Sequence, residues 1–375
     1  MIAQQIIETG NHYEELDLYL KNSGYQKLLL VCGKSIKYFA IGEYFDTLEE
    51  RLGIRVIRFS DFKPNPVYES VVEGVKLLKE ENCHLIVAVG GGSAIDVSKC
   101  IKLFSNMDDS LNYLQQTIVP NDIELIVVPT TAGTGSEATR YAVIYYEAEK
   151  KSIADDSCIP AIVVVDPTVL ETLPEYQKKV TMLDALCHAT ESFWSVNASD
   201  ESQKYSAEAI ALIIEHYYGY LANIKEGNAG MMKAANIAGK AINMTETTAG
   251  HAMCYKLTSL YGIAHGHATA LCVSKLFPYM IGHIDKCADI RGKEYLSQMF
   301  ISLAKAYECD TPEQAADKFD KMLKGLGLQN PTAENKDYEI LKSSVNPVRL
   351  KNNPVKLDAE AIDFLYHQIL DHTTK

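Results

Sequence analysis

The chain lacks several features that mark whole classes of protein. It has no excess of positive charge, because 36 Lys and Arg stand against 49 Asp and Glu, for a net charge of −13. Nucleic acids and anionic membranes attract basic surfaces, so we expect neither as a partner. No apolar run approaches the roughly 20 residues of a membrane span, and the first thirty residues show no basic segment typical of a secretory signal. We therefore expect a cytoplasmic protein.

Paired cysteines are missing as well. The nine cysteines are an odd number, and no two of them form a C-x-x-C pair. This spacing indicates reduced thiols and not a disulfide framework. With 47% hydrophobic and 23% charged residues, the composition is that of an ordinary globular protein. At 375 residues the chain is longer than one hydrophobic core usually grows, so we expect two domains.

Short apolar runs alternate with amphipathic stretches up to about residue 175. We predict strands at residues 28–31, 54–58, 85–89, 125–128 and 162–165, and helices at 71–79 and 94–103. Such alternation indicates a largely parallel sheet with helices on its faces. Beyond residue 178 only helical spacing remains, with a predicted capping box at Thr311-Pro312-Glu313-Gln314 and a helix end at Gly325 and Gly327. We predict an α/β domain over residues 1–175 and an all-α domain over 176–375.

Two loops rich in small residues each follow a predicted strand. Gly90-Gly91-Gly92-Ser93 joins a strand to a helix, with Asp96 in the first helical turn, and residues 130–136 have the sequence TTAGTGS. Backbone N–H groups in such a loop bind phosphate at a positive helix end. GGGS is not the G-x-G-x-x-G fingerprint, so a plain tight turn is the alternative. Two such loops at the carboxyl ends of parallel strands favour a nucleotide site.

Four side chains have the spacing of a metal site. Asp184 and His188 are four residues apart in a predicted helix, so they leave the same face one turn apart. His251 and His265 flank a segment broken by glycine, which allows a second pair of helices to supply the other ligands. Imidazole with carboxylate favours a first-row transition metal over Mg or Ca. The alternative is that these are ordinary core side chains.

The chain resembles the iron-containing, or group III, alcohol dehydrogenases along nearly its whole length. The motifs that carry the resemblance are Pro64-Asn65-Pro66, Gly90-Gly91-Gly92-Ser93-Ala94-Ile95-Asp96, Pro129-Thr130-Thr131-Ala132-Gly133-Thr134-Gly135-Ser136-Glu137, Asp166-Pro167, Asp184-Ala185-Leu186-Cys187-His188 and His265-Gly266. The resemblance implies a Rossmann-like N-terminal domain that binds NAD(P), a helical C-terminal domain, and one divalent metal. Fe2+ is the first expectation, with Zn2+ or Mn2+ as alternatives.

The resemblance also implies site residues. Its metal ligands correspond to the same four side chains, Asp184, His188, His251 and His265. Its cofactor contacts correspond to Gly91, Gly92, Ser93, Asp96, Thr130, Thr131, Ser136, Lys151 and Leu170. A homodimer or larger homo-oligomer is also implied.

The chain departs from the family pattern at two positions. Many relatives carry a second His one turn after the third ligand, where this chain has Tyr255. The identity of the proton donor is therefore undecided, and the candidates are Tyr255, His267 and ordered water. Where several NAD-preferring relatives place an Asp after the first strand, this chain has Gly33. The absence of a carboxylate removes one barrier to the 2′-phosphate of NADPH, but the choice between NADH and NADPH stays open.

The segments 252–258 and 345–354 resemble the branch that reduces sulfoacetaldehyde or phosphonoacetaldehyde. We therefore expect an NAD(P)H-linked reductase of a short anionic aldehyde, which would form isethionate or 2-hydroxyethylphosphonate. Arg140, Lys256, Arg349 and Lys351 are the candidates for binding the anion, because a guanidinium binds tetrahedral oxyanions bidentately. The alternative is that these are surface charges.

Three rival functions stay open at this point. The main one is a general short-chain alcohol or diol dehydrogenase. A cyclase of the dehydroquinate synthase type has the same architecture but uses a Glu-His-His ligand set. A non-catalytic metal-binding protein is the third, although structural metal sites tend to be saturated with Cys and His.

Overall fold

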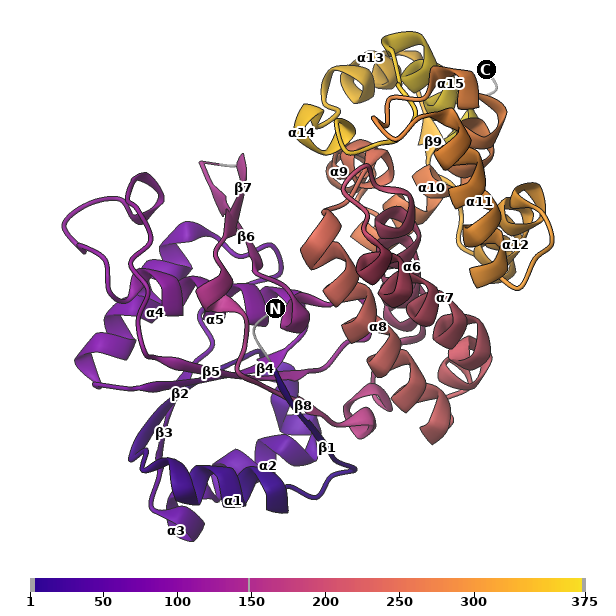
Figure 1. The fold of residues 1–375 in the computed structure, drawn as a ribbon. Helices are drawn as coiled ribbons and strands as arrows, with labels where there is room; N and C mark the ends of the chain where they lie inside the picture. The colour runs from indigo at the N-terminus through magenta and orange to yellow at the C-terminus, as the bar shows by residue number, and fades with distance from the viewer. Residues whose placement is uncertain (1–3, 148, 373–375) are drawn as a thin grey trace. The chain divides into compact units, whose positions relative to one another are not determined.

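The structure is a computed structural model that describes residues 4–147 and 149–372. The chain forms two compact units, Met1–Leu173 and Pro174–Lys375. The first is an α/β unit and the second is helical, as the sequence predicts (Figure 1).

A six-stranded parallel sheet forms the centre of the first unit. Its strands are β1 (Gln5–Glu8), β2 (Lys27–Cys32), β3 (Arg55–Phe59), β4 (Leu85–Gly90), β5 (Glu124–Pro129) and β8 (Ile162–Val165), in the order β1-β8-β5-β4-β2-β3. All five predicted strands are confirmed, and β1 was not predicted. Strand β4 is buried along its whole length, because helices cover both faces of the sheet, and its sequence is accordingly a continuous apolar run.

Helices lie on both faces of this sheet. Figure 1 shows α1 (Glu14–Ser23), α2 (Ala40–Asp46) and α3 (Leu48–Leu52) on one face and α4 (Tyr68–Glu80) and α5 (Gly92–Phe104) on the other. The last two are the helices that the sequence predicts. Apolar side chains of α4 and α5 pack with those of β2, β4 and β5 in one core cluster. Five short 3-10 helices, η1 to η5, complete the unit at Lys34–Tyr38, Tyr113–Gln115, Ser136–Ala138, Asp156–Cys158 and Pro167–Leu170.

The strand order places a switch point between β2 and β4. From β2 the chain runs outward to β3, whereas from β4 it runs in the opposite direction to β5. Open parallel sheets bind ligands at the carboxyl ends of strands at such a point. Gly33 follows β2 and the glycine-rich loop follows β4, so both lie at this edge. A separate antiparallel hairpin, β6 (Tyr141–Tyr146) and β7 (Glu149–Ala154), which was not predicted, stands between β5 and β8 in sequence.

The second unit is built around a long buried helix, α6 (Glu175–Trp194), which packs against α7, α8, α10 and α11. The other helices are α7 (Asp200–Leu221), α8 (Lys225–Thr245), α9 (Ala249–Tyr261), α10 (His265–Gly282), α11 (Lys293–Ala306), α12 (Pro312–Gly325), α13 (Asn335–Ser343), α14 (Pro347–Leu350), α15 (Ala359–Ile369) and the 3-10 helix η6 (Ile284–Lys286). The predicted capping box of α12 is confirmed at Thr311 and Gln314. A short parallel pair, β9 (Thr332–Ala333) and β10 (Asp371–His372), is the one strand element in this otherwise helical unit among the described residues.

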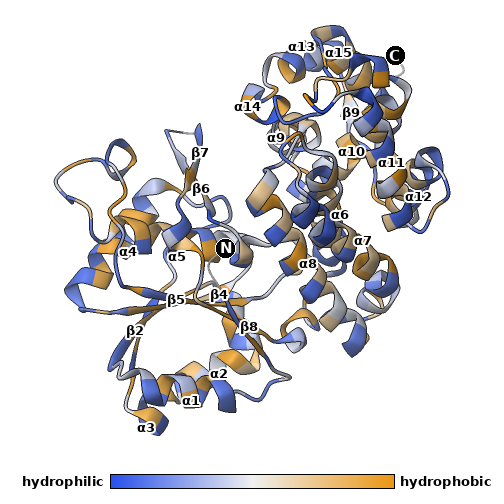
Figure 2. Cartoon of the chain, viewed as in Figure 1, coloured by the Kyte–Doolittle hydropathy of each residue, from blue (hydrophilic) through white to orange (hydrophobic). Residues whose placement is uncertain are grey.

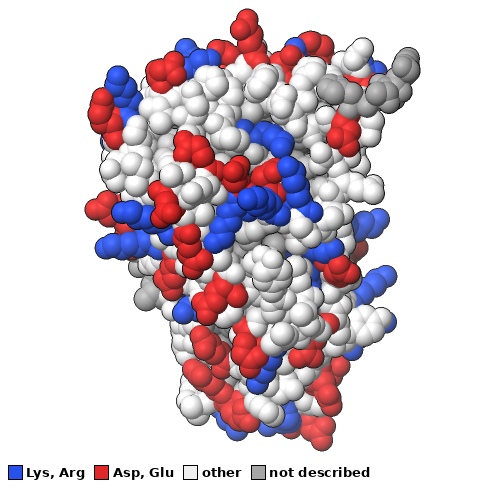
Figure 3. Space-filling view, turned by 90° about the vertical axis from the view of Figure 1, so that its right-hand side faces the viewer, with Lys and Arg blue, Asp and Glu red and all other residues white. Residues whose placement is uncertain are grey.

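The surface agrees with the composition. Figure 2 shows hydrophobic and hydrophilic residues on different sides of most helices, as amphipathic packing requires. On the face drawn in Figure 3, Asp and Glu side chains are widely spread and Lys and Arg lie among them. Among the described helices, none combines the length and the apolar character needed to cross a membrane.

Candidate active site

The first two predicted metal ligands lie on α6. Asp184 and His188 are one turn apart, and the Oδ1 atom of Asp184 lies 4.0 Å from Nε2 of His188. Their side chains are 6% and 8% exposed. A carboxylate and an imidazole are buried here in the middle of a largely buried helix, where polar groups are costly unless they have partners.

The other two predicted ligands come from α9 and α10. His251 lies in the first turn of α9, and His265 is the first residue of α10. Gly262, with φ of 68°, ends α9 in the left-handed conformation that glycine adopts most readily. The chain then turns back, and Nε2 of His251 and Nε2 of His265 each lie 3.9 Å from Oδ1 of Asp184. The structure thus brings together the four side chains that the spacing indicates.

Three of these side chains, Asp184, His188 and His251, have ligand atoms that all lie within 4.8 Å of one another, and His265 approaches the same oxygen of Asp184 from α10. Two ligand atoms that each lie about 2.0–2.2 Å from one tetrahedral ion are about 3.4 Å apart. The three nitrogen-to-oxygen distances of 3.9–4.0 Å exceed this by about half an ångström, so the side chains would move slightly inward around a bound ion. All three histidines turn Nε2 towards Asp184. The donor set of one carboxylate and three imidazoles suits Fe, Zn or Mn.

A buried carboxylate that was not predicted holds one of these imidazoles. Glu191 is fully buried, and its Oε2 atom makes a short contact with Nδ1 of His251. Its Oε1 atom accepts hydrogen bonds from the hydroxyl and the backbone N–H of Thr248, at 2.6 and 3.1 Å. Burial raises the pKa of Glu191, and the hydrogen bonds from Thr248 and His251 oppose that shift. A carboxylate at Nδ1 keeps the proton there and leaves Nε2 as the lone-pair donor.

The sequence does contain a signal for Glu191. It lies seven residues after Asp184 and three after His188, so all three share one face of α6. A cysteine lies at the same ring position of His265, whose Nδ1 atom is 3.5 Å from Sγ of Cys254. The site is most open at His265, whose side chain is 37% exposed while that of His251 is 3% exposed.

The two predicted proton-relay residues lie in different surroundings. The ring of Tyr255 stacks on the ring of His265, with centroids 5.8 Å apart and planes 9° apart. Burial raises the pKa of Tyr255, so its hydroxyl keeps its proton at neutral pH. His267 is buried, and its ring meets that of Tyr176 edge-on at 6.5 Å. Burial lowers the pKa of His267. Of the two, Tyr255 is the residue that contacts a candidate ligand.

Of the four predicted anion-binding residues, Arg349 lies nearest to this cluster by its contacts. Its guanidinium hydrogen-bonds the Tyr255 hydroxyl, and its Nη1 atom lies 2.6 Å from Oε2 of Glu246. Lys256 is five residues after His251 on α9, about 140° around the helix axis, so it leaves another face. Lys351 is exposed just after α14. Arg140 belongs to the first unit, where its side chain lies over the Tyr141 ring.

In the first unit, the two predicted cofactor loops lie against each other. Helix α5 begins at Gly92, with Gly91 as its N-cap residue. A Cβ atom on Gly91 would lie 3.1 Å from the side chain of Thr131, and one on Gly92 would lie 3.0 Å from that of Thr134. These glycines therefore allow the loops to approach closely. The N–H groups at the start of α5, including that of the half-buried Ser93, form a site suited to phosphate.

Two other predicted cofactor residues bind each other. The Ser136 hydroxyl donates to Oδ1 of Asp96 at 2.7 Å, and the Val143 N–H donates to Oδ2 at 3.1 Å. Lys99, which the sequence reasoning missed, is buried, and its Nζ atom donates to the carbonyl oxygens of Ser136 and Thr139 at 2.6 Å each. Burial raises the pKa of Asp96, and the charge of Lys99 opposes the shift. These contacts fasten the second loop to α5.

The remaining predicted cofactor residues are more scattered. Thr130 is buried and pairs through its N–H with the carbonyl of Gly90, at 3.0 Å. Leu170 is buried in η5. Lys151 lies on the hairpin strand β7, where it pairs with Glu149 at 2.6 Å. Their roles in cofactor binding stay predictions.

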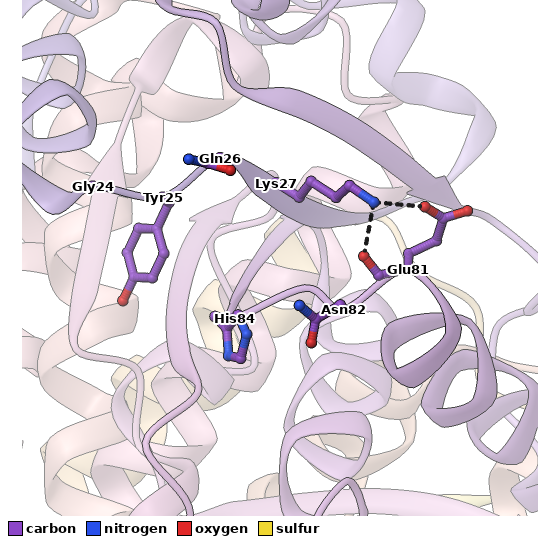
Figure 4. A pocket seen from close by; sticks show the side chains of 7 residues that line it. All are labelled: Gly24, Tyr25, Gln26, Lys27, Glu81, Asn82 and His84. Atoms are coloured by element: carbon purple, nitrogen blue, oxygen red, sulfur yellow. Dashed lines mark hydrogen bonds and ion pairs between the residues drawn. The ribbon is translucent and has the colours of Figure 1, made fainter.

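A separate hollow lies at the opposite edge of the sheet. It is lined by Gly24, Tyr25, Gln26, Lys27, Glu81, Asn82 and His84 (Figure 4). The ion pair of Lys27 with Glu81, at 3.3 Å, stands on its wall. These residues surround the amino ends of β2 and β4, whereas parallel sheets bind ligands at the carboxyl ends. The hollow is therefore no part of the candidate active site.

Comparison with known proteins agrees with this geometry. Residues 3–167 match the family model for iron-containing alcohol dehydrogenase, and residues 178–370 match the model for the C-terminal part of the same family. The chain is 30% identical over 378 residues to choline dehydrogenase of Bacillus subtilis, covering 94% of this chain and 90% of that one. It is 29% identical over 311 residues to phosphonoacetaldehyde reductase of Streptomyces viridochromogenes, covering 78% of each.

A solved structure agrees along the whole chain. The crystal structure of sulfoacetaldehyde reductase from Bifidobacterium kashiwanohense in complex with NAD+ superposes with a TM-score of 0.87 and 25% identity, covering 100% of this chain and 99% of that one. The predicted fold class is thereby confirmed. This chain belongs to the iron-containing alcohol dehydrogenase family.

Proposed function

We propose that the chain reduces a short anionic aldehyde, sulfoacetaldehyde or phosphonoacetaldehyde, to its primary alcohol with NAD(P)H. The reaction class follows from the family: the chain is an alcohol dehydrogenase that uses a nicotinamide dinucleotide and a divalent metal. The anionic substrate is the part that is proposed. Its main support is Arg349, whose contacts connect it through Tyr255 to the candidate ligand His265.

We assign the metal to Asp184, His188, His251 and His265. When bound, the dinucleotide supplies a hydride and the ion stabilises negative charge on the aldehyde oxygen. Glu191 holds the proton of His251 on Nδ1, so that Nε2 faces the other ligands. The start of α5 and the adjoining loop bind the phosphates of the dinucleotide. If Asp184→Ala or His265→Ala retained full turnover and metal content, this assignment would be wrong.

Arg349 is placed to orient the substrate. A guanidinium carries five N–H donors in a planar fork, so it can contact Glu246, Tyr255 and a sulfonate or phosphonate at the same time. Its side chain is 17% exposed, which leaves it accessible to a small solute. The tyrosine hydroxyl between Arg349 and His265 is the nearest candidate to donate the proton that completes the alcohol.

The choice of dinucleotide depends on the carboxyl end of β2. Gly33-Lys34-Ser35 follows the strand, and Lys34 and Ser35 are exposed. A carboxylate here would repel a 2′-phosphate, and this stretch contains none. We propose that the enzyme accepts NADPH as well as NADH. A homodimer or larger homo-oligomer and a cytoplasmic location stay predictions.

A substrate panel tests the proposal. Initial rates with each dinucleotide should be measured for sulfoacetaldehyde, phosphonoacetaldehyde, butanal and 3-hydroxypropanal, and for choline oxidation in the reverse direction. We expect the highest kcat/KM for an anionic aldehyde. Arg349→Ala should raise KM for that substrate about tenfold or more, because a charged hydrogen bond contributes about 1.5–3 kcal/mol. Arg51→Ala is the matched control, because Arg51 pairs with Asp17 at 2.8 Å in the other unit.

The same panel decides between the rivals. A preference for the neutral aldehydes in the wild type would favour a general alcohol or diol dehydrogenase, and efficient oxidation of choline would favour a cationic substrate. Either result, or an unchanged KM in Arg349→Ala, would refute the anionic substrate. Net consumption of NAD(P)H argues against a cyclase, because a cyclase regenerates its cofactor within each turnover.

A further inference from the structure

Glu246 has an unusual backbone conformation next to the candidate active site. It follows α8 with φ of 58° and ψ of 172°, a region that residues other than glycine rarely adopt. A strained residue persists only where its surroundings hold it in place. Glu246 sits two residues before Thr248, whose hydroxyl binds Glu191. The strain therefore lies in the segment that connects α8 to the ligand-bearing α9.

Two side chains from one later segment hold Glu246. Its Oε2 atom lies 2.6 Å from Nη1 of Arg349 and accepts a hydrogen bond from Nδ2 of Asn352 at 3.1 Å. Asn352 is itself fixed, because Nδ2 also donates to the carbonyl of Thr247 at 3.1 Å and Oδ1 accepts from Asn197 at 3.3 Å. The carboxylate thus stands in a rigid frame beside the guanidinium.

The pair of Arg349 and Glu246 determines the net charge next to the proposed substrate position. Arg349 and Glu246 together carry no net charge, so the pair offers N–H donors to an anion without a surplus positive charge. Of the other predicted cations, Lys256 leaves another face of α9 and Lys351 is exposed. Among the described side chains that these contacts place around Arg349, an anion meets the attraction of the guanidinium and the repulsion of the Glu246 carboxylate a few ångströms further away.

We infer that Glu246 makes the site selective for a singly charged oxyanion, so that the sulfonate is the preferred substrate over the phosphonate. The inference rests on the proposed anionic-aldehyde function. A sulfonate carries one negative charge, whereas a phosphonate above neutral pH carries nearly two, as phosphate monoesters do. The second charge gains little from a neutralised guanidinium, yet it must still be removed from water.

The size of the effect can be estimated from Coulomb's law. At a separation of about 6 Å and an effective dielectric constant of about 40, one charge pair changes an equilibrium about tenfold. The carboxylate of Glu246 should therefore lower kcat/KM for the doubly charged phosphonate about tenfold relative to that for the singly charged sulfonate. We expect wild-type enzyme at pH 8 to prefer sulfoacetaldehyde. Glu246→Gln should raise kcat/KM for both, and more for the phosphonate, so that the ratio shifts about fivefold or more towards the phosphonate.

The control and a second variant guard against a simple folding defect. Glu308→Gln is matched, because Glu308 also has positive φ, at 55°, and pairs with Lys318 at 3.2 Å. It should leave the ratio unchanged. Glu246→Gly removes the carboxylate and relieves the strained backbone, and it should shift the ratio in the same direction as Glu246→Gln. Turnover of butanal by each variant reports whether the metal site is intact.

The outcomes separate this inference from the proposed function. If the wild type prefers butanal or choline to both anions, both proposals fail. If it reduces anionic aldehydes best but prefers the phosphonate, or if the ratio in Glu246→Gln and Glu246→Gly stays within twofold of that in Glu308→Gln, only the role of Glu246 is refuted. A shift towards the phosphonate in both variants, with the ratio unchanged in the control, supports it.

Discussion

Replacing Glu191 by glutamine tests how the protein prepares His251 for a metal. Glutamine has nearly the same size and shape, and its carbonyl oxygen can accept the two hydrogen bonds that Thr248 donates at 2.6 and 3.1 Å. Its amide nitrogen, however, is a donor facing Nδ1 of His251. The imidazole is then expected to move its proton to Nε2 and to accept at Nδ1. The proton would occupy the atom that must bind the metal.

The expected loss follows from this exchange of donor and acceptor. Mutation of such an outer partner typically costs 10–100-fold in metal affinity, or about 1.4–2.7 kcal/mol. We expect a loss near 100-fold for Glu191→Gln, because Glu191 is fully buried and water has little access to replace its carboxylate at Nδ1 of His251. The metal-free protein should lose less, since the isosteric side chain keeps the contacts with Thr248.

Metal affinity is best measured by titrating metal-free protein with Zn2+ or Fe2+ against a competing chelator, and thermal unfolding of the metal-free form reports on folding. Glu175→Gln is the matched control, because Glu175 lies at the start of the same helix and pairs with Lys179 at 2.6 Å. We expect weaker binding in Glu191→Gln alone. Wild-type affinity in that variant would refute the positioning role, and an equal loss of stability with and without metal would indicate packing alone.

Three further predictions follow. Lys99→Met should lower the free energy of unfolding by about 3 kcal/mol or more, because it leaves buried carbonyl oxygens of the second loop without a donor. Urea unfolding measures this change. Lys76→Met is the control and should leave the free energy of unfolding unchanged, because Lys76 is exposed. Gly33→Asp should reduce kcat/KM for NADPH about tenfold or more while that for NADH changes little, because the carboxylate repels a 2′-phosphate. Gly33 has ordinary φ, and a Cβ atom there would meet the Ser35 hydroxyl at an ordinary contact distance of 4.0 Å. Equal losses with the two dinucleotides would contradict this. Removal of the metal by a chelator should abolish activity and lower the melting temperature, since a ligand at 100 times its Kd stabilises by about 2.7 kcal/mol; Fe2+ or Zn2+ should restore both.

The fold was predictable where one physical pattern dominates. Strands buried on both faces are continuous apolar runs, and β2, β4, β5 and β8 follow from that signal. The edge strand β3 was predicted as a buried strand too, but only Phe59 in it is buried. The edge strand β1 is partly exposed and only four residues long, so its pattern is too weak. The hairpin of β6 and β7 was missed for a similar reason, because β7 is polar and largely exposed.

In the candidate site, the residues that could be predicted are those related by short spacings in the sequence, and the missed ones depend on contacts between distant segments. Asp184 and His188 share a helix face by their spacing alone, and Glu191 was within reach of the same argument. The pairing of His251 with His265 required a turn, and Gly262 supplied a visible reason for one. The contacts of Lys99 span about 40 residues, and no periodicity in the sequence connects a helix with the carbonyls of a later loop.

Glu246 shows why the chemistry around a ligand set is harder to read than the set itself. A metal restricts its ligands to a few residue types, so Asp and His in the right pattern stand out. The carboxylate of Glu246 reaches Arg349 across 103 residues, and its backbone conformation has no signature in sequence. The selectivity that we propose depends on the balance between this guanidinium and this carboxylate, and moving either group by a few ångströms would change it. The reaction class is therefore encoded in short motifs, whereas the substrate preference that we propose depends on a tertiary contact that only the folded chain creates.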